Sequence, residues 1–172
     1  QTARYVVVWA DDDRGAVAGR TIATHGSMSR PFQVSVRDVA ASAPVLATSG
    51  TRVLVAWQQR GRHNDVYVRS IERGGPSGPA EGIATGGDDE RAPALAWDPQ
   101  KQKFGIAWLN GRRAGVEVGW RTLDSRGSPV GGPATVSGDG DATAITLSCT
   151  RGSCLVSAIR NRNVVSEILS LR

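Results

Sequence analysis

The runs YVVVW at residues 5–9, VLVAW at residues 53–57 and FGIAW at residues 104–108 recur at a nearly constant interval along the chain. Each run is of β-type composition and ends in tryptophan, and the tryptophans are 48 and then 51 residues apart. A fourth run, CLVSA at residues 154–158, follows 50 residues later with alanine in place of tryptophan. Such self-similarity predicts a protein built from repeats of one small structural unit.

Two further landmarks keep the same register. An arginine followed by a hydroxyl residue and an aliphatic residue lies 11, 12 and 13 residues after the three tryptophans, at Arg20, Arg69 and Arg121. An Ala-Pro pair precedes two of the runs, at residues 43–44 and 92–93. Short β-branched segments between Gly, Ser and Pro turns indicate up to four strands in each repeat. We place the repeats approximately at residues 1–39, 40–87, 88–139 and 140–172.

Four short antiparallel strands in a repeat of about 50 residues are typical of a β-propeller blade. The order of an Ala-Pro strand, a turn, a Val-rich strand ending in Trp and a further strand resembles the divergent repeats of bacterial extracellular propeller proteins. The resemblance covers nearly the whole chain and implies an all-β fold with about 3.5 four-stranded antiparallel blades. Its motifs specify a fold and no function, and the Ser-x-Asp-x-Gly-x-x-Trp box of sialidase-type blades is absent.

The first predicted blade lacks its first strand and the last lacks its fourth. Uncovered blade faces and open sheet edges favour association with further structure. We therefore expect an incomplete ring or part of a larger propeller, with further blades supplied by the same parent protein or by another chain. A four-bladed ring closed within the chain is the alternative, since propellers begin at four blades.

The recurrent tryptophans are interpreted as packing residues. Trp9, Trp57 and Trp108 occupy one repeat position, and we expect each to fill the space between neighbouring blades, because large aromatic side chains bury wherever a geometry repeats. Trp97 and Trp120 stand outside this register. Packing is the favoured interpretation for these two as well, with sugar stacking as the alternative.

Composition and charge exclude several classes of function. Apolar residues make up 40% of the chain and charged residues 22%, which are ordinary values for a globular protein. No apolar stretch approaches the length of a membrane span, so we expect none. The net charge of +5 is carried by arginines spread along the chain, without a clustered stripe or a recognisable nucleic-acid-binding module. We therefore expect no nucleic-acid partner.

The sequence predicts no catalytic residue, metal site or cofactor. His25 and His63 are the only histidines and lie in different classes of loop, which argues against a Ser-His-Asp triad. The acidic runs at residues 11–13 and 88–90 are interpreted as solvated turns, with calcium ligands as the less common alternative. No pattern places two carboxyl groups across a cleft as glycosidase chemistry requires. Two cysteines without a neighbouring histidine supply only half of a zinc site.

Cys149 and Cys154 flank the predicted turn at residues 150–153, between the first two strands of the last repeat. In a hairpin of this length the two side chains face each other within disulfide range. We predict a disulfide, which favours an oxidising compartment and a secreted protein, extracellular or periplasmic. The alternative is a reduced pair in a cytosolic protein.

Strand alternation predicts that one side of the disc is strongly charged, because loops from the second to the third strand emerge beside loops that join successive blades. Arginine suits the bidentate capture of carboxylate or sulfate, so we predict a ligand-binding face for a protein or an acidic glycan. The alternative is that these arginines pair with neighbouring acids and only maintain solubility. The candidate ligand-binding residues are Arg60, Arg62, His63, Arg112, Arg113, Arg160 and Arg162. The accompanying acids are Asp88, Asp89, Glu90, Asp139 and Asp141.

These observations favour a non-catalytic recognition module of an exported bacterial protein. Part of a propeller glycoside hydrolase, whose other blades supply the catalytic groups, is one alternative. A structural or assembly element is the other. Binding on a glycan array, turnover of model glycosides and self-association without ligand distinguish the three.

Overall fold

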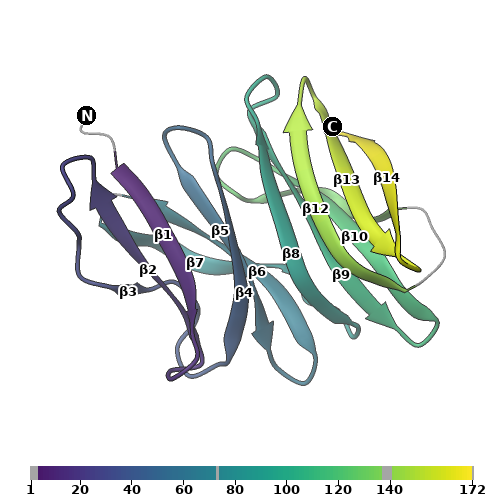
Figure 1. The fold of residues 1–172 in the computed structure, drawn as a ribbon, viewed down its shortest axis with the longest axis horizontal. Helices are drawn as coiled ribbons and strands as arrows, with labels where there is room; N and C mark the ends of the chain where they lie inside the picture. The colour runs from purple at the N-terminus through teal and green to yellow at the C-terminus, as the bar shows by residue number, and fades with distance from the viewer. Residues whose placement is uncertain (1–3, 73, 137–140, 172) are drawn as a thin grey trace.

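The computed structural model describes residues 4–72, 74–136 and 141–171, and every regular element in these residues is a β-strand. The strands form four separate antiparallel sheets that stand side by side (Figure 1). The first sheet contains β1 (Arg4–Asp11), β2 (Ala16–Ala23) and β3 (Phe32–Gln33). The second contains β4 (Ala41–Thr48), β5 (Val53–Arg60), β6 (Asn64–Glu72) and β7 (Gly75–Ala84). The third contains β8 (Asp89–Asp98), β9 (Lys103–Arg112), β10 (Gly115–Leu123) and β11 (Pro129–Val136). The fourth contains β12 (Ala142–Thr150), β13 (Ser153–Arg160) and β14 (Asn163–Ser170).

The fold is that of propeller blades in an open array, as the repeats predict. Each sheet is built from strands that are consecutive in sequence, and each strand is antiparallel to the next. The first strands of successive blades, β4, β8 and β12, contact one another, and β1 contacts β4. The ring is not closed, because β1–β3 and β12–β14 lie at opposite ends of the array (Figure 1).

The Ala-Pro motif forms a bulge in the first strand of a blade. Ala43 and Ala92 adopt positive φ angles of 50° and 47°, and the pairing register of β4 and β8 shifts at these points. A bulge leaves one residue without a ladder partner, and proline has no N–H to donate to a ladder. The motif therefore stands where a strand interrupts its regular pairing.

The hydrophobic core consists of three layers, one between each pair of neighbouring sheets. Because side chains alternate along a strand, β5 serves two of these layers. Val55 and Trp57 belong to the layer shared with the first sheet, whereas Leu54 and Ala56 belong to the layer shared with the third. Both inner sheets are thus covered on both faces.

The tryptophans pack between blades. Trp57 and Trp108 are buried in the layers ahead of the second and third sheets, and Trp120 is buried between the third and fourth sheets. The Trp108 ring lies over Gly119, its partner on β10, where any Cβ would collide with the indole. Trp97 packs against Phe104 with ring centroids 4.6 Å apart. The interpretation as packing residues is confirmed for these four.

The repeated arginine connects one blade to the preceding one. Arg69 of β6 donates through Nε to the carbonyl of Gly78 in its own sheet at 2.8 Å, and through Nη1 to the carbonyl of Val34, just after β3, at 3.2 Å. Arg121 of β10 repeats this arrangement with Gly131 and, at 3.0 Å, with Ile83 of β7. A positional repeat in the sequence therefore corresponds to a repeated contact between sheets.

Candidate functional site

Loops of two classes meet on one side of the array, as strand alternation requires. Asn64, at the start of β6, donates through Nδ2 to the carboxylate of Asp89 at 2.6 Å. Arg112, at the end of β9, donates through Nε to Asp88 Oδ2 at 3.0 Å. Asp88 lies in the connection between the second and third sheets and Asp89 begins β8, so hairpin tips and blade connections share this side. We call it the charged loop face.

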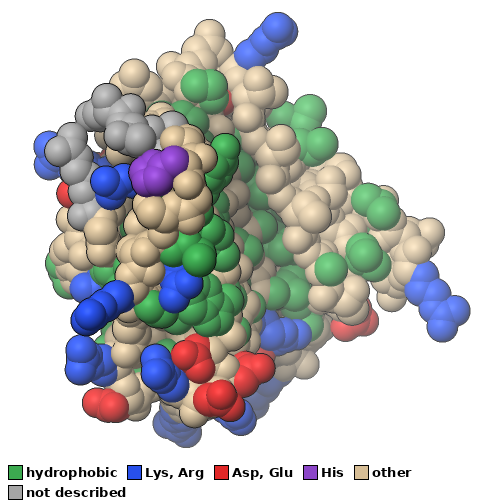
Figure 2. Space-filling view, turned by 60° about the vertical axis from the view of Figure 1, so that its left-hand side comes forward, with side chains coloured by type: hydrophobic (Ala, Val, Ile, Leu, Met, Phe, Trp, Pro, Cys, Tyr) green, Lys and Arg blue, Asp and Glu red, His purple; other side chains and the backbone are tan. Residues whose placement is uncertain are grey.

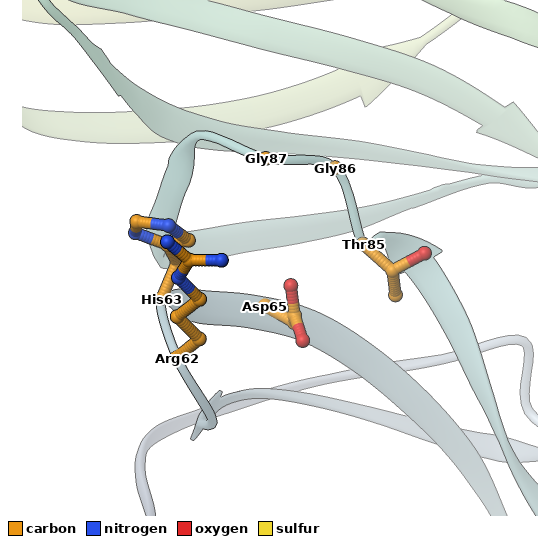
Figure 3. A pocket seen from close by; sticks show the side chains of 6 residues that line it. All are labelled: Arg62, His63, Asp65, Thr85, Gly86 and Gly87. Carbon is orange, nitrogen blue, oxygen red and sulfur yellow. The ribbon is translucent and has the colours of Figure 1, made fainter.

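An open hollow of about 470 Å³ lies on this face within the second blade. Arg62 and His63 approach it from the tip of the β5–β6 hairpin, and Asp65 projects from β6 between that tip and the end of β7 (Figure 3). Thr85 and two glycines of the β7–β8 connection complete the wall (Figure 3). Small residues at this connection leave the hollow open.

The hollow combines a cation with a carboxylate that is readily neutralised. Within the described part of the chain, Arg62 forms no ion pair with an acidic side chain. Burial raises the pKa of Asp65, and the neighbouring His63 partly opposes that rise. Acidification therefore protonates Asp65 sooner than an ordinary aspartate, and the hollow then becomes more positive.

The other candidate arginines fall into two groups. Arg112 is held by two carboxylates, those of Asp88 at 3.0 Å and Glu117 at 2.9 Å, and Arg160 is buried. For Arg112 the alternative interpretation, pairing with a neighbouring acid, describes the structure. Arg60, Arg113 and Arg162 are exposed on the loop side, at or beside hairpin tips, and do not line the hollow. Asp139 lies outside the described residues.

Glu90 is the residue that sequence reasoning misjudged. The acidic run at residues 88–90 suggested a solvated turn, but β8 begins at Asp89 and strand alternation turns Glu90 inward, where it is almost completely buried. Its Oε1 accepts a hydrogen bond from the Gly86 amide at 3.1 Å. Burial raises the pKa of Glu90, and the carboxylates of Asp65 and Asp88 raise it further. Glu90 thus holds the backbone of Gly86, a residue that lines the hollow, in place through this hydrogen bond.

The predicted cysteine pair lies in the fourth sheet. Cys149 and Cys154 are paired opposite each other on β12 and β13, with Cα atoms 4.0 Å apart and sulfur atoms at disulfide distance. The turn between them contains Arg151 and Gly152, both with positive φ, as a two-residue hairpin requires.

Among the residues described, no group of three or more His, Cys, Asp or Glu side chains is placed to hold a metal ion. No helix in the same residues is long and apolar enough to cross a membrane.

Comparison with known proteins assigns the chain to no family. No protein-family model and no curated protein sequence matches the chain. Among solved structures, the chain is similar to the crystal structure of the tricorn protease, with a TM-score of 0.49 and 11% sequence identity. The similar region covers 96% of this chain and 21% of that protein, so the chain spans about a fifth of its length.

Proposed function

We propose that this chain is a non-catalytic recognition module of an exported bacterial protein, and that its charged loop face binds acidic groups of a glycan or a protein. The observation that carries the proposal is the open hollow at Arg62 and His63, in which the arginine has no acidic partner among the described residues. A guanidinium at the rim of a hollow suits a carboxylate or sulfate group. Loops on a rigid scaffold are where binding residues concentrate.

The site is centred on Arg62 and His63, with the exposed Arg60 at the end of β5 beside them. Arg113 and Arg162, at the corresponding hairpin tips of the next two blades, extend the cationic surface for a longer ligand. Arg112 and Arg160 serve the structure of the face, since the first is held by Asp88 and Glu117 and the second is buried. The cysteine pair supports export, because disulfides persist in oxidising compartments.

Heparin chromatography tests the proposal. We expect the double substitution Arg60→Ala/Arg62→Ala to elute at clearly lower salt than the unmodified chain, because two guanidinium groups of the site are lost. The matched control is Arg30→Ala/Arg151→Ala, which removes the same charge from exposed positions in loops of the opposite class. Equal losses for the two double variants would show that retention follows net charge alone, and would refute the site.

The pH dependence provides a second readout. Because burial raises the pKa of Asp65, lowering the pH from neutral neutralises this carboxylate early and removes its repulsion toward an anion. We expect heparin retention to strengthen on acidification, and the Asp65→Asn variant to be more strongly retained at neutral pH and to show less of this dependence. Retention of the chain on heparin but not on immobilised poly-glutamate would identify a sulfated glycan as the better ligand class.

A further inference from the structure

The two end sheets expose faces that are buried at the same register positions in the inner sheets. Val66 of β6 and Val118 of β10 are 0% exposed, whereas Val164, which takes the same position on β14, is 73% exposed. Ile168 is 72% exposed, and its counterpart Thr122 is 7% exposed. In the inner sheets the following sheet covers these positions. The outer face of β12–β14 is therefore shaped to receive a sheet.

The first sheet exposes the complementary half of the same interface. Val7 of β1 occupies the position of Val55 on β5 and Ile106 on β9, and its exposure is 44% where theirs is 0%. In the inner sheets this face packs on the preceding sheet. Figure 2, which brings this end of the molecule forward, shows hydrophobic side chains reaching the surface among basic ones.

The hydrogen bonds of Arg20 also indicate that no sheet covers the outer face of the first sheet. Its counterparts Arg69 and Arg121 each donate to a backbone carbonyl of the preceding sheet, at 3.2 and 3.0 Å. The corresponding atom of Arg20, Nη1, lies 3.5 Å from the Met28 sulfur instead of bonding to a carbonyl of another sheet. Its buried Nε, whose counterparts donate within their own sheets, also has no acceptor among the described residues. A thioether sulfur is a weak acceptor, so a backbone carbonyl from a sheet placed ahead of the first would be a favourable partner for Nη1.

The outer face of the fourth sheet is chemically suited to cover this end. Strand alternation places Leu155, Ile159, Val164 and Ile168 on it, together with Ser157 and Ser166, whose hydroxyl oxygens are 2.7 Å apart. No charged side chain of β12–β14 lies on this face. Since β14 pairs only with β13 among the described strands, its free edge also presents backbone carbonyl groups.

We propose that the outer face of β1–β3 in one copy of this chain docks on the outer face of β12–β14 in a second copy. The contact repeats between molecules the apolar packing that occurs three times within one molecule. The carbonyl acceptor for Arg20 comes from the free edge of β14, whereas Arg69 and Arg121 use carbonyls at the fourth-strand position of the preceding blade. Two copies joined at both ends contain about eight sheets, which is within the range of closed propellers. The contact is heterologous, because two different faces of the chain meet.

Sedimentation velocity with two complementary variants of the full chain tests this contact. Val7→Glu places a charge on the first face and Ile168→Glu places one on the fourth. Both side chains are exposed, so both variants should fold, which circular dichroism and thermal unfolding verify. We expect the unmodified chain to dimerise, each variant alone to be monomeric, and a mixture of the two to associate again through the one pair of intact faces. Val130→Glu, at an exposed position on β11, is the control and should dimerise normally.

Three results would overturn the proposal: an unmodified chain that stays monomeric at high concentration, an Ile168→Glu variant that still dimerises, or a mixture that fails to associate.

The variant Arg20→Ala tests the polar part of the contact. Loss of a hydrogen bond from a charged donor should raise the dissociation constant at least about tenfold without lowering the melting temperature of the monomer. An unchanged dissociation constant would remove Arg20 from the contact.

Discussion

Strands β9 and β13 occupy the same place in their repeats and differ in how they are covered. Phe104, Ile106 and Trp108 on one face of β9 are buried, and so are Ala107 and Leu109 on the other. On β13 the face toward the third sheet is buried, while Leu155 and Ile159 on the opposite face are exposed. The difference lies in the number of neighbouring sheets, because both strands are paired on both sides within their own sheets. In this fold, whether a side chain is buried therefore depends on whether a neighbouring sheet covers its face.

The largest effect on stability is expected when Trp57 is replaced, and the comparison is with Trp9, which has the same position in its repeat. We expect Trp57→Ala to lower the free energy of unfolding by about 3–5 kcal/mol, the usual effect of emptying a buried aromatic site. Trp9 is only half-buried, since the described residues include no sheet ahead of the first. Its replacement by alanine should cost about 1 kcal/mol. Urea unfolding followed by circular dichroism, at concentrations where the chain is monomeric, measures both. Equal losses would show that the outer face of the first sheet is covered in solution.

The junction of the third and fourth sheets gives the next largest effect. Asp98 accepts hydrogen bonds from the amides of Gln100 and Lys101 at 2.8 Å, and from the Gly152 amide of the fourth sheet at 2.6 Å. Burial opposes its ionisation, but these hydrogen bonds outweigh that effect and lower the pKa of Asp98. We expect Asp98→Asn to destabilise the chain by about 2 kcal/mol at neutral pH.

The sign of the pH dependence follows from the lowered pKa. The stabilisation by ionised Asp98 is fully present above the ordinary aspartate pKa of about 3.9, and is lost as the pH falls through the lower value of the folded state. The gap between the unmodified chain and Asp98→Asn should therefore close in acid. Asp124→Asn is the matched control, since Asp124 accepts from the amides of Arg126 and Ser128 within its own turn and, among the described residues, is hydrogen-bonded to no second sheet. A larger loss for Asp124→Asn would contradict the inter-sheet role of Asp98.

Reduction of the cysteine pair should have a smaller effect, confined to the fourth sheet. The bond closes a short hairpin that is already held by strand pairing, so we expect reduction to lower the free energy of unfolding by about 1–2 kcal/mol. Hydrogen exchange should accelerate in β12–β14 and remain unchanged in β9 and β10. Intact mass before and after reduction identifies the bond, and a chain that gains no mass on reduction would exclude it.

The smallest effect concerns Glu90, at the junction of the second and third sheets. Because its pKa is raised in the folded state, ionised Glu90 destabilises the chain above that pKa, and stability should increase as the pH falls toward the ordinary glutamate value of about 4.3. Glu90→Gln keeps an acceptor for the Gly86 amide and should stabilise the chain at neutral pH by about 1 kcal/mol or less. Thermal unfolding at several pH values measures this. A variant that is less stable than the unmodified chain at neutral pH would refute this account.

Sequence reasoning succeeded where a feature depends on near neighbours in the chain. The three Trp-terminated runs fall in β1, β5 and β9, the Ala-Pro pairs fall in strands β4 and β8, and the spacing of Cys149 and Cys154 placed them opposite each other. It failed for Glu90 and left Arg112 undecided, because their surroundings come from different strands and connections. The ligand-binding role of the charged loop face stays a prediction.

The sequence by itself determined the strands, their register and the blade-like repeat, because side-chain alternation and turn chemistry act over a few residues. Only the tertiary structure decided which of two equivalent faces is covered. Arg20 and Arg69 are alike in the sequence, yet only Arg69 reaches a carbonyl of a preceding sheet. The physical reason is that burial and hydrogen bonding at these positions depend on whether a neighbouring sheet is present, and the sequence of a single repeat does not determine that.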